Sequence, residues 1–125
     1  ARSASLAQAA RGADLLIHEA ISPRLDAIMH QAAQNARREN VGAIFHDIMD
    51  YHTSPEDAGR VAQEAGAGAL ALTHFLPQTP IPGLTHTFVV AAQRTYDGPV
   101  FAMRDGDVIS LPREGGMLRS HHLRF

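Results

Sequence analysis

Two histidines and one glutamate occupy positions from which they could move protons or bind a metal ion. His74 follows the small apolar run 69–72, whose pattern predicts a short strand buried on both faces. Glu19 follows a second apolar run at 13–17, and His52 lies directly before a strongly signalled helix start. Open α/β sheets usually bind their ligands at the carboxyl ends of strands. Because three separate segments repeat this placement, the sequence predicts one polar site.

Two helices that flank these positions have clear start signals. Ser22-Pro23 and Ser54-Pro55 each place a capping serine before a proline at the first helical position. Two acidic residues follow the second proline, where their negative charges interact favourably with the positive end of the helix dipole. Gly66 is expected to end this second helix. The alanine-rich face of the helix implies close packing on a sheet.

The remaining segments complete an alternation of helices and strands. Helices are expected in two further segments: 3–12, and from Thr85 or Thr87 to about Thr95. Within the less readable segment 39–51, residues 41–48 could form a short helix or a loop that closes over a site. Segments 99–103 and 108–111 are predicted to pair as a hairpin across Asp105-Gly106. The alternation indicates the α/β class.

The composition of the chain limits its function classes. Its 125 residues suit one domain, and 45% hydrophobic with 19% charged residues is ordinary for a soluble globular protein. A net charge of −2 argues against extensive binding to a nucleic-acid backbone. The absence of cysteine excludes disulfides and thiolate chemistry, and suits the cytoplasm or the periplasm. No apolar run reaches the length of a membrane span, and no signal peptide is recognisable, so we expect a soluble protein.

Five ordered stretches together resemble a known family. They are Ala13–Ala20, Tyr51–Ser54, Leu72–Phe75, Tyr96–Val100 and Arg104–Asp107. The set resembles the C-terminal half of a metallo-β-lactamase-fold hydrolase, in the branch that holds ribonuclease Z and the zinc-dependent arylsulfatases. The resemblance implies half of an αββα sandwich, with a mixed sheet flanked by helices, over residues 1–112. Residues 113–125 contain Gly115-Gly116 and no periodicity, and are expected to form a flexible tail.

The resemblance also assigns roles to three residues. His74 matches the last metal-binding histidine, which ligates one zinc of a two-metal pair. His52 matches the catalytic histidine that protonates the leaving group, and Glu19 matches the carboxylate that orients it. Two metals about 3.5–4 Å apart activate a water, and a positioned histidine typically contributes about 10²- to 10⁴-fold. The alternative is a buried Glu19–His52 pair that holds two loops together, and a lone histidine such as His74 is more often structural.

The metal site of the resembled family is incomplete in these 125 residues. Its His-x-His-x-Asp-His loop, a further histidine and a bridging aspartate have no counterpart here. One histidine cannot hold a zinc ion, which needs about three or four protein ligands. We therefore expect zinc binding by the chain alone to be weak or absent, and we expect no hydrolytic activity from the isolated chain.

Two departures from the family pattern bear on the substrate. Ribonuclease Z usually reads His-Ser-Thr where this chain reads His52-Thr53-Ser54. After the last histidine it favours Ser-x-Arg, whereas this chain has Phe75-Leu-Pro-Gln78. Together with the lack of basic charge, these differences favour a small sulfate ester, phosphodiester or lactone over nucleic acid. A tRNA-processing nuclease similar to ribonuclease Z is the alternative.

A half sandwich would need a partner to cover its sheet. Leu70, Leu72, Val100 and Phe101 are expected to expose an apolar patch, covered by the missing N-terminal half or by a second copy in a homo-oligomer. A non-catalytic, oligomer-forming α/β module that has lost the metal site is the competing interpretation.

Five other polar residues receive structural or uncertain assignments. His18 is expected on the opposite face of its strand, in a structural role. His46 and Asp47 could line the pocket. His121-His122, in the tail, is interpreted as incidental.

Overall fold

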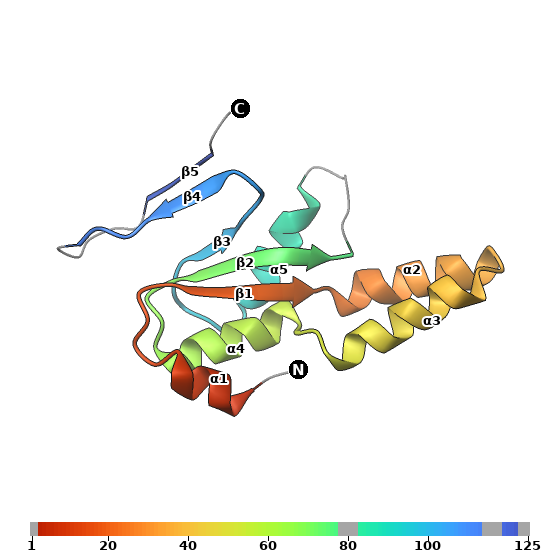
Figure 1. The fold of residues 1–125 in the computed structure, drawn as a ribbon, viewed down its shortest axis with the longest axis horizontal. Helices are drawn as coiled ribbons and strands as arrows, with labels where there is room; N and C mark the ends of the chain where they lie inside the picture. Colours follow the sequence, from red (N-terminus) through yellow and green to blue (C-terminus); the bar gives the residue numbers. More distant parts are fainter. Residues whose placement is uncertain (1–2, 78–82, 114–118, 123–125) are drawn as a thin grey trace.

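The computed structural model describes residues 3–77, 83–113 and 119–122 (Figure 1). Helices and strands alternate along most of this length. In chain order they are α1 (Ala4–Ala9), β1 (Leu16–Ile21), α2 (Pro23–Asn35), α3 (Glu39–Asp47), the 3₁₀ turn η1 (Ile48–Asp50), α4 (Pro55–Ala65), β2 (Leu70–Leu76), α5 (Leu84–Ala92), β3 (Val100–Ala102), β4 (Asp107–Ser110) and β5 (Arg119–His122).

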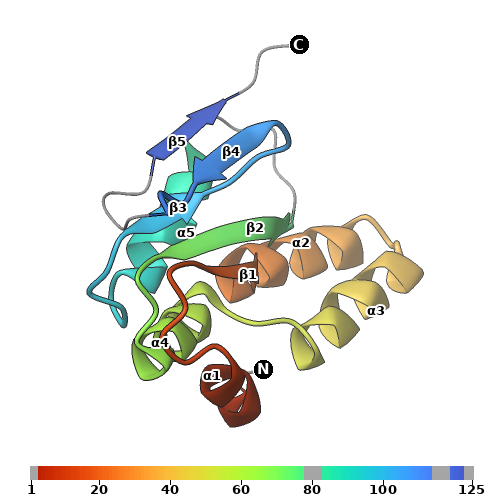
Figure 2. The ribbon, with the colours of Figure 1, turned by 60° about the vertical axis from the view of Figure 1, so that its left-hand side comes forward.

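The central sheet has three parallel strands in the order β1-β2-β3. Helix α4 packs against β1 and β2, and against α1 and α5, while α5 packs against β3 (Figures 1 and 2). The expected α/β class, a sheet flanked by helices, is confirmed. The expected mixed sheet is not seen among the described residues, because the antiparallel pair β4-β5 forms a separate sheet. Strand β5 lies in the segment expected to form a flexible tail.

The two segments that were predicted to pair as a hairpin lie in different sheets, so that prediction is wrong. Segment 99–103 contains β3, which pairs with β2, and segment 108–111 overlaps β4, which pairs with β5. The turn between them does form: Gly106 has a φ of +87°, and the Asp107 N–H donates to the Arg104 carbonyl at 3.0 Å. A turn dipeptide specifies only a local reversal, whereas burial selects the partner of an apolar strand such as β3.

The core lies between the central sheet and α4. Leu70 and Leu72 are 0% exposed and pack in one cluster with α4 residues. Side chains two apart on a strand point to the same face, and α4 covers this face. The expected exposed patch is therefore wrong for both leucines, while Val100 and Phe101 are half-buried. The cluster includes these residues of α4: Ala58, Val61 and Ala62.

The predicted helix starts are confirmed at atomic detail. The Ser22 hydroxyl accepts the Leu25 N–H at 3.4 Å, and the Ser54 hydroxyl accepts the Asp57 N–H at 3.1 Å. Gly66 ends α4 in the left-handed conformation, with a φ of +60°. These local signals fix the starts of two helices: α2, which follows β1, and α4, which follows the segment with His52.

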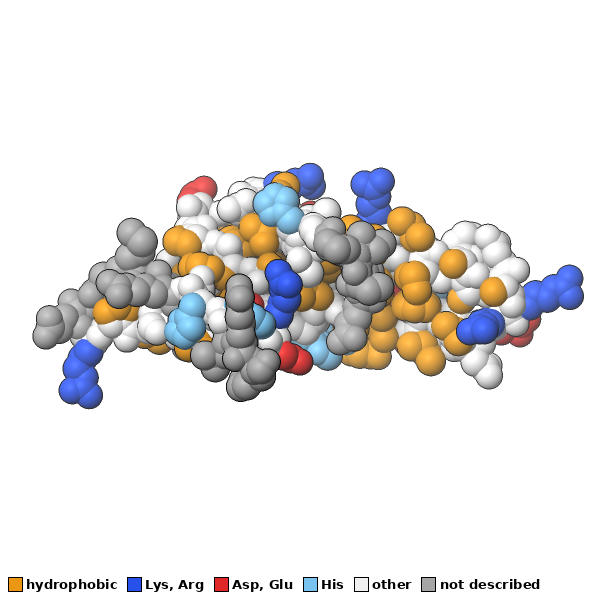
Figure 3. Space-filling model, turned by 90° about the horizontal axis from the view of Figure 1, so that it is seen from above, with side chains coloured by type: hydrophobic (Ala, Val, Ile, Leu, Met, Phe, Trp, Pro, Cys, Tyr) orange, Lys and Arg blue, Asp and Glu red, His pale blue; other side chains and the backbone are white. Residues whose placement is uncertain are grey.

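Helices α2 and α3 form an antiparallel pair that projects from the rest of the molecule (Figure 1). The segment 41–48, for which a helix or a loop was expected, is helical: α3 covers Glu39–Asp47, and η1 begins at Ile48. Figure 3 shows hydrophobic side chains exposed where this pair projects. Ile28 on α2 and Ile44 on α3 are both exposed. Within the described residues, no helix is both long and apolar enough to cross a membrane.

Candidate functional site

His74 occupies a β-bulge in β2. Thr73 pairs with Glu19 and Phe75 pairs with Ala20, so His74 has no pairing partner on β1. Its backbone is left-handed, with a φ of +47°, which is rare outside glycine. A bulge bends the strand and redirects a side chain, and the His74 side chain is exposed. The strand that was expected to end before His74 therefore continues past it to Leu76.

The carboxylate of Glu19 binds the segment that carries His52. Its Oε2 lies 3.0 Å from His52 Nδ1, and its Oε1 accepts the Thr53 N–H at 2.6 Å. The His52 side chain is 16% exposed and that of Glu19 is 25% exposed, so the pair is reachable yet largely shielded from water. Because an ionised carboxylate only accepts hydrogen bonds, Nδ1 is the donor, and this fixes the imidazole tautomer.

The two predicted histidines come together beside this carboxylate. The ring centroids of His52 and His74 lie 5.8 Å apart, with their planes tilted by 32°. The ring of Tyr51, which is exposed, lies 5.0 Å from that of His52. The structure thus brings Glu19, His52 and His74 together from three separate segments.

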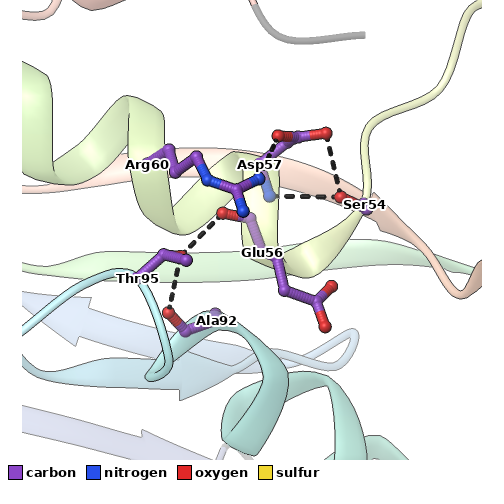
Figure 4. Close-up of polar contacts among 6 residues, drawn as sticks. All are labelled: Ser54, Glu56, Asp57, Arg60, Ala92 and Thr95. Atoms are coloured by element: carbon purple, nitrogen blue, oxygen red, sulfur yellow. Dashed lines mark hydrogen bonds and ion pairs between the residues drawn. The ribbon is translucent and has the colours of Figure 1, made fainter.

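The segment before α4 is held in place at both ends. The Ile21 N–H at the end of β1 donates to the Thr53 carbonyl at 2.9 Å. On the other side, the Thr95 hydroxyl contacts two carbonyls, that of Glu56 at 2.7 Å and that of Ala92 at 3.2 Å (Figure 4). Thr95 therefore connects the segment after α5 to the first turn of α4, the helix that follows the His52 segment.

Close packing at Gly59 supports the same junction. A Cβ placed on Gly59 would contact the Thr95 hydroxyl and lie 2.5 Å from the Ala92 carbonyl oxygen. Only a residue without a side chain lets α4 and the end of α5 approach this closely. This contact brings α4, the helix that follows the His52 segment, close to the end of α5.

A second carboxylate–histidine pair lies in the β4-β5 sheet. Asp107 Oδ1 is 2.7 Å from His122 Nδ1, and Oδ2 accepts the Arg104 N–H at 2.7 Å. The bond from the Arg104 backbone, together with the interaction with His122, holds the pKa of Asp107 below its ordinary value. No local pattern links His122 to a partner 15 positions away, so the interpretation of His122 as incidental misses this pair.

The other sequence candidates lie outside the Glu19–His52–His74 cluster. His18 Nδ1 contacts the Glu19 carbonyl oxygen at 2.8 Å, which fits the structural role expected for it. Asp47 is exposed at the end of α3, the side chain of His46 falls outside the described part, and His121 is exposed in β5. Residues 78–82 also fall outside the described part.

The described residues do not supply a complete metal site. Nowhere in residues 3–77, 83–113 and 119–122 do three His, Asp or Glu side chains converge so that they could hold a metal ion. A zinc site needs about three or four protein ligands. His74, exposed on its bulge, is the one residue of this chain for which the resemblance implies metal binding.

Comparison with a solved structure defines the class of fold. The metallo-β-lactamase-fold protein YhfI from Bacillus subtilis superposes with a TM-score of 0.53 at 24% sequence identity. The superposition covers 96% of this chain and 36% of that protein. No family model matches the sequence. The chain therefore has the fold of part of a metallo-β-lactamase domain.

Sequence comparison then identifies relatives within this class. Ribonuclease Z of Mycobacterium tuberculosis (strain ATCC 25177 / H37Ra) is 33% identical over 96 residues, which are 77% of this chain and 31% of that protein. Ribonuclease Z of Mycobacterium sp. (strain KMS) is 38% identical over 74 residues, or 59% of this chain and 22% of that protein. The chain is homologous to part of ribonuclease Z, a metallo-β-lactamase-fold hydrolase, and spans about a third of the first of these curated relatives.

Proposed function

We propose that this chain is the C-terminal part of a metal-dependent hydrolase and is inactive on its own. The observation that carries the proposal is the Glu19–His52 hydrogen bond of 3.0 Å, with the His74 ring 5.8 Å from that of His52. A carboxylate-oriented imidazole next to a position for a metal ligand suits hydrolysis of an ester with a poor leaving group. Homology to part of ribonuclease Z supports the same reaction class.

In this proposal His52 delivers a proton to the leaving group. The Nδ1–H of His52 donates a hydrogen bond to Glu19, so Nε2 is the ring nitrogen that faces the substrate. The step starts from the imidazolium form: the Nε2 proton passes to the departing oxygen, and the ring is left neutral with its remaining proton on Nδ1. The second Glu19 oxygen holds the Thr53 N–H, and this second anchor prevents the imidazole segment from shifting. Transfer of the Nε2 proton to the departing oxygen neutralises the negative charge that develops there as the ester bond breaks.

The metal chemistry requires residues from outside this chain. A pair of divalent ions, zinc in the resembled branch, would supply the activated water when bound. His74 would contribute one ligand, and the left-handed bulge, which takes His74 out of register with β1, would set the direction of its imidazole. The remaining ligands would come from an N-terminal half. "Complete protein" below means this chain together with that half.

Two substrate classes remain to be distinguished. The net charge of −2 and the residues after His52 and His74 favour a small sulfate ester, phosphodiester or lactone. The curated relatives are named ribonuclease Z, which favours RNA. The small-molecule reading is our first choice, and the RNA reading is the second.

Turnover by the complete protein tests the proposal. The substrates are an aryl sulfate, a bis-aryl phosphodiester, an aryl lactone and a precursor tRNA, each with and without a chelator. We expect chelator-sensitive hydrolysis of at least one small substrate, and a loss of about 10²- to 10⁴-fold in the His52→Ala variant. His30→Ala is the matched control, because His30 is bonded to Gln34 on α2, away from the site. Turnover of precursor tRNA alone would favour the second reading, and no metal-dependent turnover at all would reject the hydrolase.

A further inference from the structure

A concave surface of about 760 Å³ adjoins His74 on the side of the separate sheet. Its polar lining comprises the side chains of three segments: β2, the start of α5, and the region from Met103 to β5. These residues include His74, Thr85, Arg104, Asp105 and His122. Figure 3 views the molecule from the side on which β4 and β5 lie in Figure 1, and histidine and charged side chains are exposed on this face.

The carboxylate of Asp107 contacts both residues that could bind an anion on this surface. Its Oδ2 accepts a hydrogen bond from the backbone N–H of Arg104, and its Oδ1 is hydrogen-bonded to the His122 ring, each at 2.7 Å. The ring therefore has the same tautomer as that of His52, with its proton on Nδ1. Among the described residues, the Arg104 guanidinium forms no ion pair. Its five N–H donors are thus not committed to a carboxylate of the described chain.

We propose that Arg104 and His122 form a subsite for a negatively charged group of the substrate, separate from the ester bond that is cleaved. The inference rests on the proposed function and adds a substrate class: esters that carry a second anionic group, such as a carboxylate, sulfonate or phosphate. A guanidinium binds such groups through two parallel hydrogen bonds. The His122 ring, whose Nδ1–H is committed to Asp107, adds a donor to an anion through Nε2–H when both of its nitrogens carry a proton. His74 lines the same surface, so one substrate could reach both positions.

Asp105 provides an internal control for this inference. Its carboxylate lines the same surface and is exposed next to Arg104, so it opposes the binding of an anion. Asp105→Asn should therefore strengthen binding of an anionic group, whereas Arg104→Gln and His122→Gln should weaken it. A purely structural role for these residues gives no reason for the two changes to have opposite signs.

Kinetics of the complete protein measure the specificity. Two aryl phosphodiesters share one leaving group, and the retained aryl group bears a carboxylate in one and a primary amide in the other. We expect Arg104→Gln to lower the ratio of their kcat/KM values (carboxylate over amide) by about ten-fold, mainly through KM. Arg94→Gln, which removes an exposed arginine that does not line this surface, should leave the ratio unchanged. The same ratio of kcat/KM values, measured for a short RNA with and without an additional terminal phosphate, tests a phosphate as the second anionic group.

Direct binding keeps the inference separate from catalysis. Calorimetry of an inert aryl phosphonate that carries a carboxylate, titrated into the complete protein, should show affinity that falls about ten-fold in Arg104→Gln and rises in Asp105→Asn. Binding that follows this order without any turnover would support the subsite and reject the hydrolase. An unchanged ratio and unchanged affinity in Arg104→Gln and His122→Gln would overturn the subsite, whatever the activity of the protein.

Discussion

The carboxylate of Glu19, on β1, lies 3.0 Å from Nδ1 of His52, across 33 positions of sequence. The same carboxylate accepts the Thr53 N–H at 2.6 Å. One side chain therefore both sets the tautomer of the imidazole and fixes the backbone that carries it. Structure and proposed chemistry depend here on the same atoms, and substitutions can separate the two.

Substitution of Glu19 should affect stability and catalysis differently. Glu19→Ala removes the acceptor of the N–H of buried Thr53, which should lower the free energy of unfolding by about 1–3 kcal/mol. Glu19→Gln keeps an oxygen for that N–H, and should be more stable than the alanine variant. The amide nitrogen of the new glutamine can face His52 and favour the tautomer with its proton on Nε2. We therefore expect kcat to lose most of the rate enhancement of about 10²- to 10⁴-fold that a correctly positioned histidine supplies. Equal activity of Glu19→Gln and the unsubstituted protein would contradict the assigned role. Denaturant unfolding and turnover, measured on the same samples, give both values.

A methyl group on Gly59 should destabilise the protein. It would collide with the Ala92 carbonyl and the Thr95 hydroxyl, and overpacking of this kind costs about 1–3 kcal/mol. Gly42→Ala is the matched control: the new methyl on α3 would meet only Gln34, at 3.9 Å, and alanine in a helix is favoured by up to about 1 kcal/mol. Thermal unfolding should therefore shift in opposite directions for the two variants, and a shared direction would contradict this account of the α4–α5 contact.

Tyr96 should make the stability fall at high pH. Burial raises the pKa of Tyr96 above its ordinary value, and its hydroxyl donates to the Ala67 carbonyl at 2.8 Å. The unfolded chain then ionises first, so stability present below about pH 10 is lost as the pH rises through the higher pKa of the folded state. The Tyr96→Phe variant should have a free energy of unfolding about 1 kcal/mol lower at neutral pH, and this free energy should decline less steeply above pH 10. Urea unfolding at pH 7, 9 and 11 measures the difference, and parallel declines would disprove it.

Asp107 should have the opposite effect at low pH. Its pKa lies below the ordinary value, chiefly because the Arg104 N–H donates to the carboxylate. The stabilisation is therefore present above the ordinary carboxyl pKa, near 4, and is lost as the pH falls through the lower pKa of the folded state. Asp107→Asn should flatten this part of the acid dependence. Unfolding at pH 6 and pH 3 checks the prediction, which fails if the variant and the unsubstituted protein lose the same stability between these values.

Local signals predicted the helices around the site well. Serine at the cap and proline at the first helical position specify a helix start through two or three neighbouring residues, and both Ser22 and Ser54 accept the expected N–H. The buried run before His74 was likewise visible in the sequence, because burial on both faces leaves no polar residue in it.

Non-local pairing explains what the sequence did not reveal. The bulge at His74 exists only in register with β1, so nothing in the residues near His74 predicts it. The failed hairpin has the same cause, since β3 and β4 take partners far from each other in sequence. His122 became a candidate only when β5 aligned it with Asp107.

The leaving-group dependence of hydrolysis tests the central claim most directly. In the complete protein, a series of aryl esters with phenols of rising pKa separates proton donation from all other effects of a substitution. If His52 protonates the departing oxygen, the His52→Ala variant should hydrolyse the ester with the most basic leaving group about 10²- to 10⁴-fold more slowly than the unsubstituted protein. The loss of rate should become progressively smaller as the phenol becomes more acidic. A uniform loss across the series, or none, would contradict proton donation by His52.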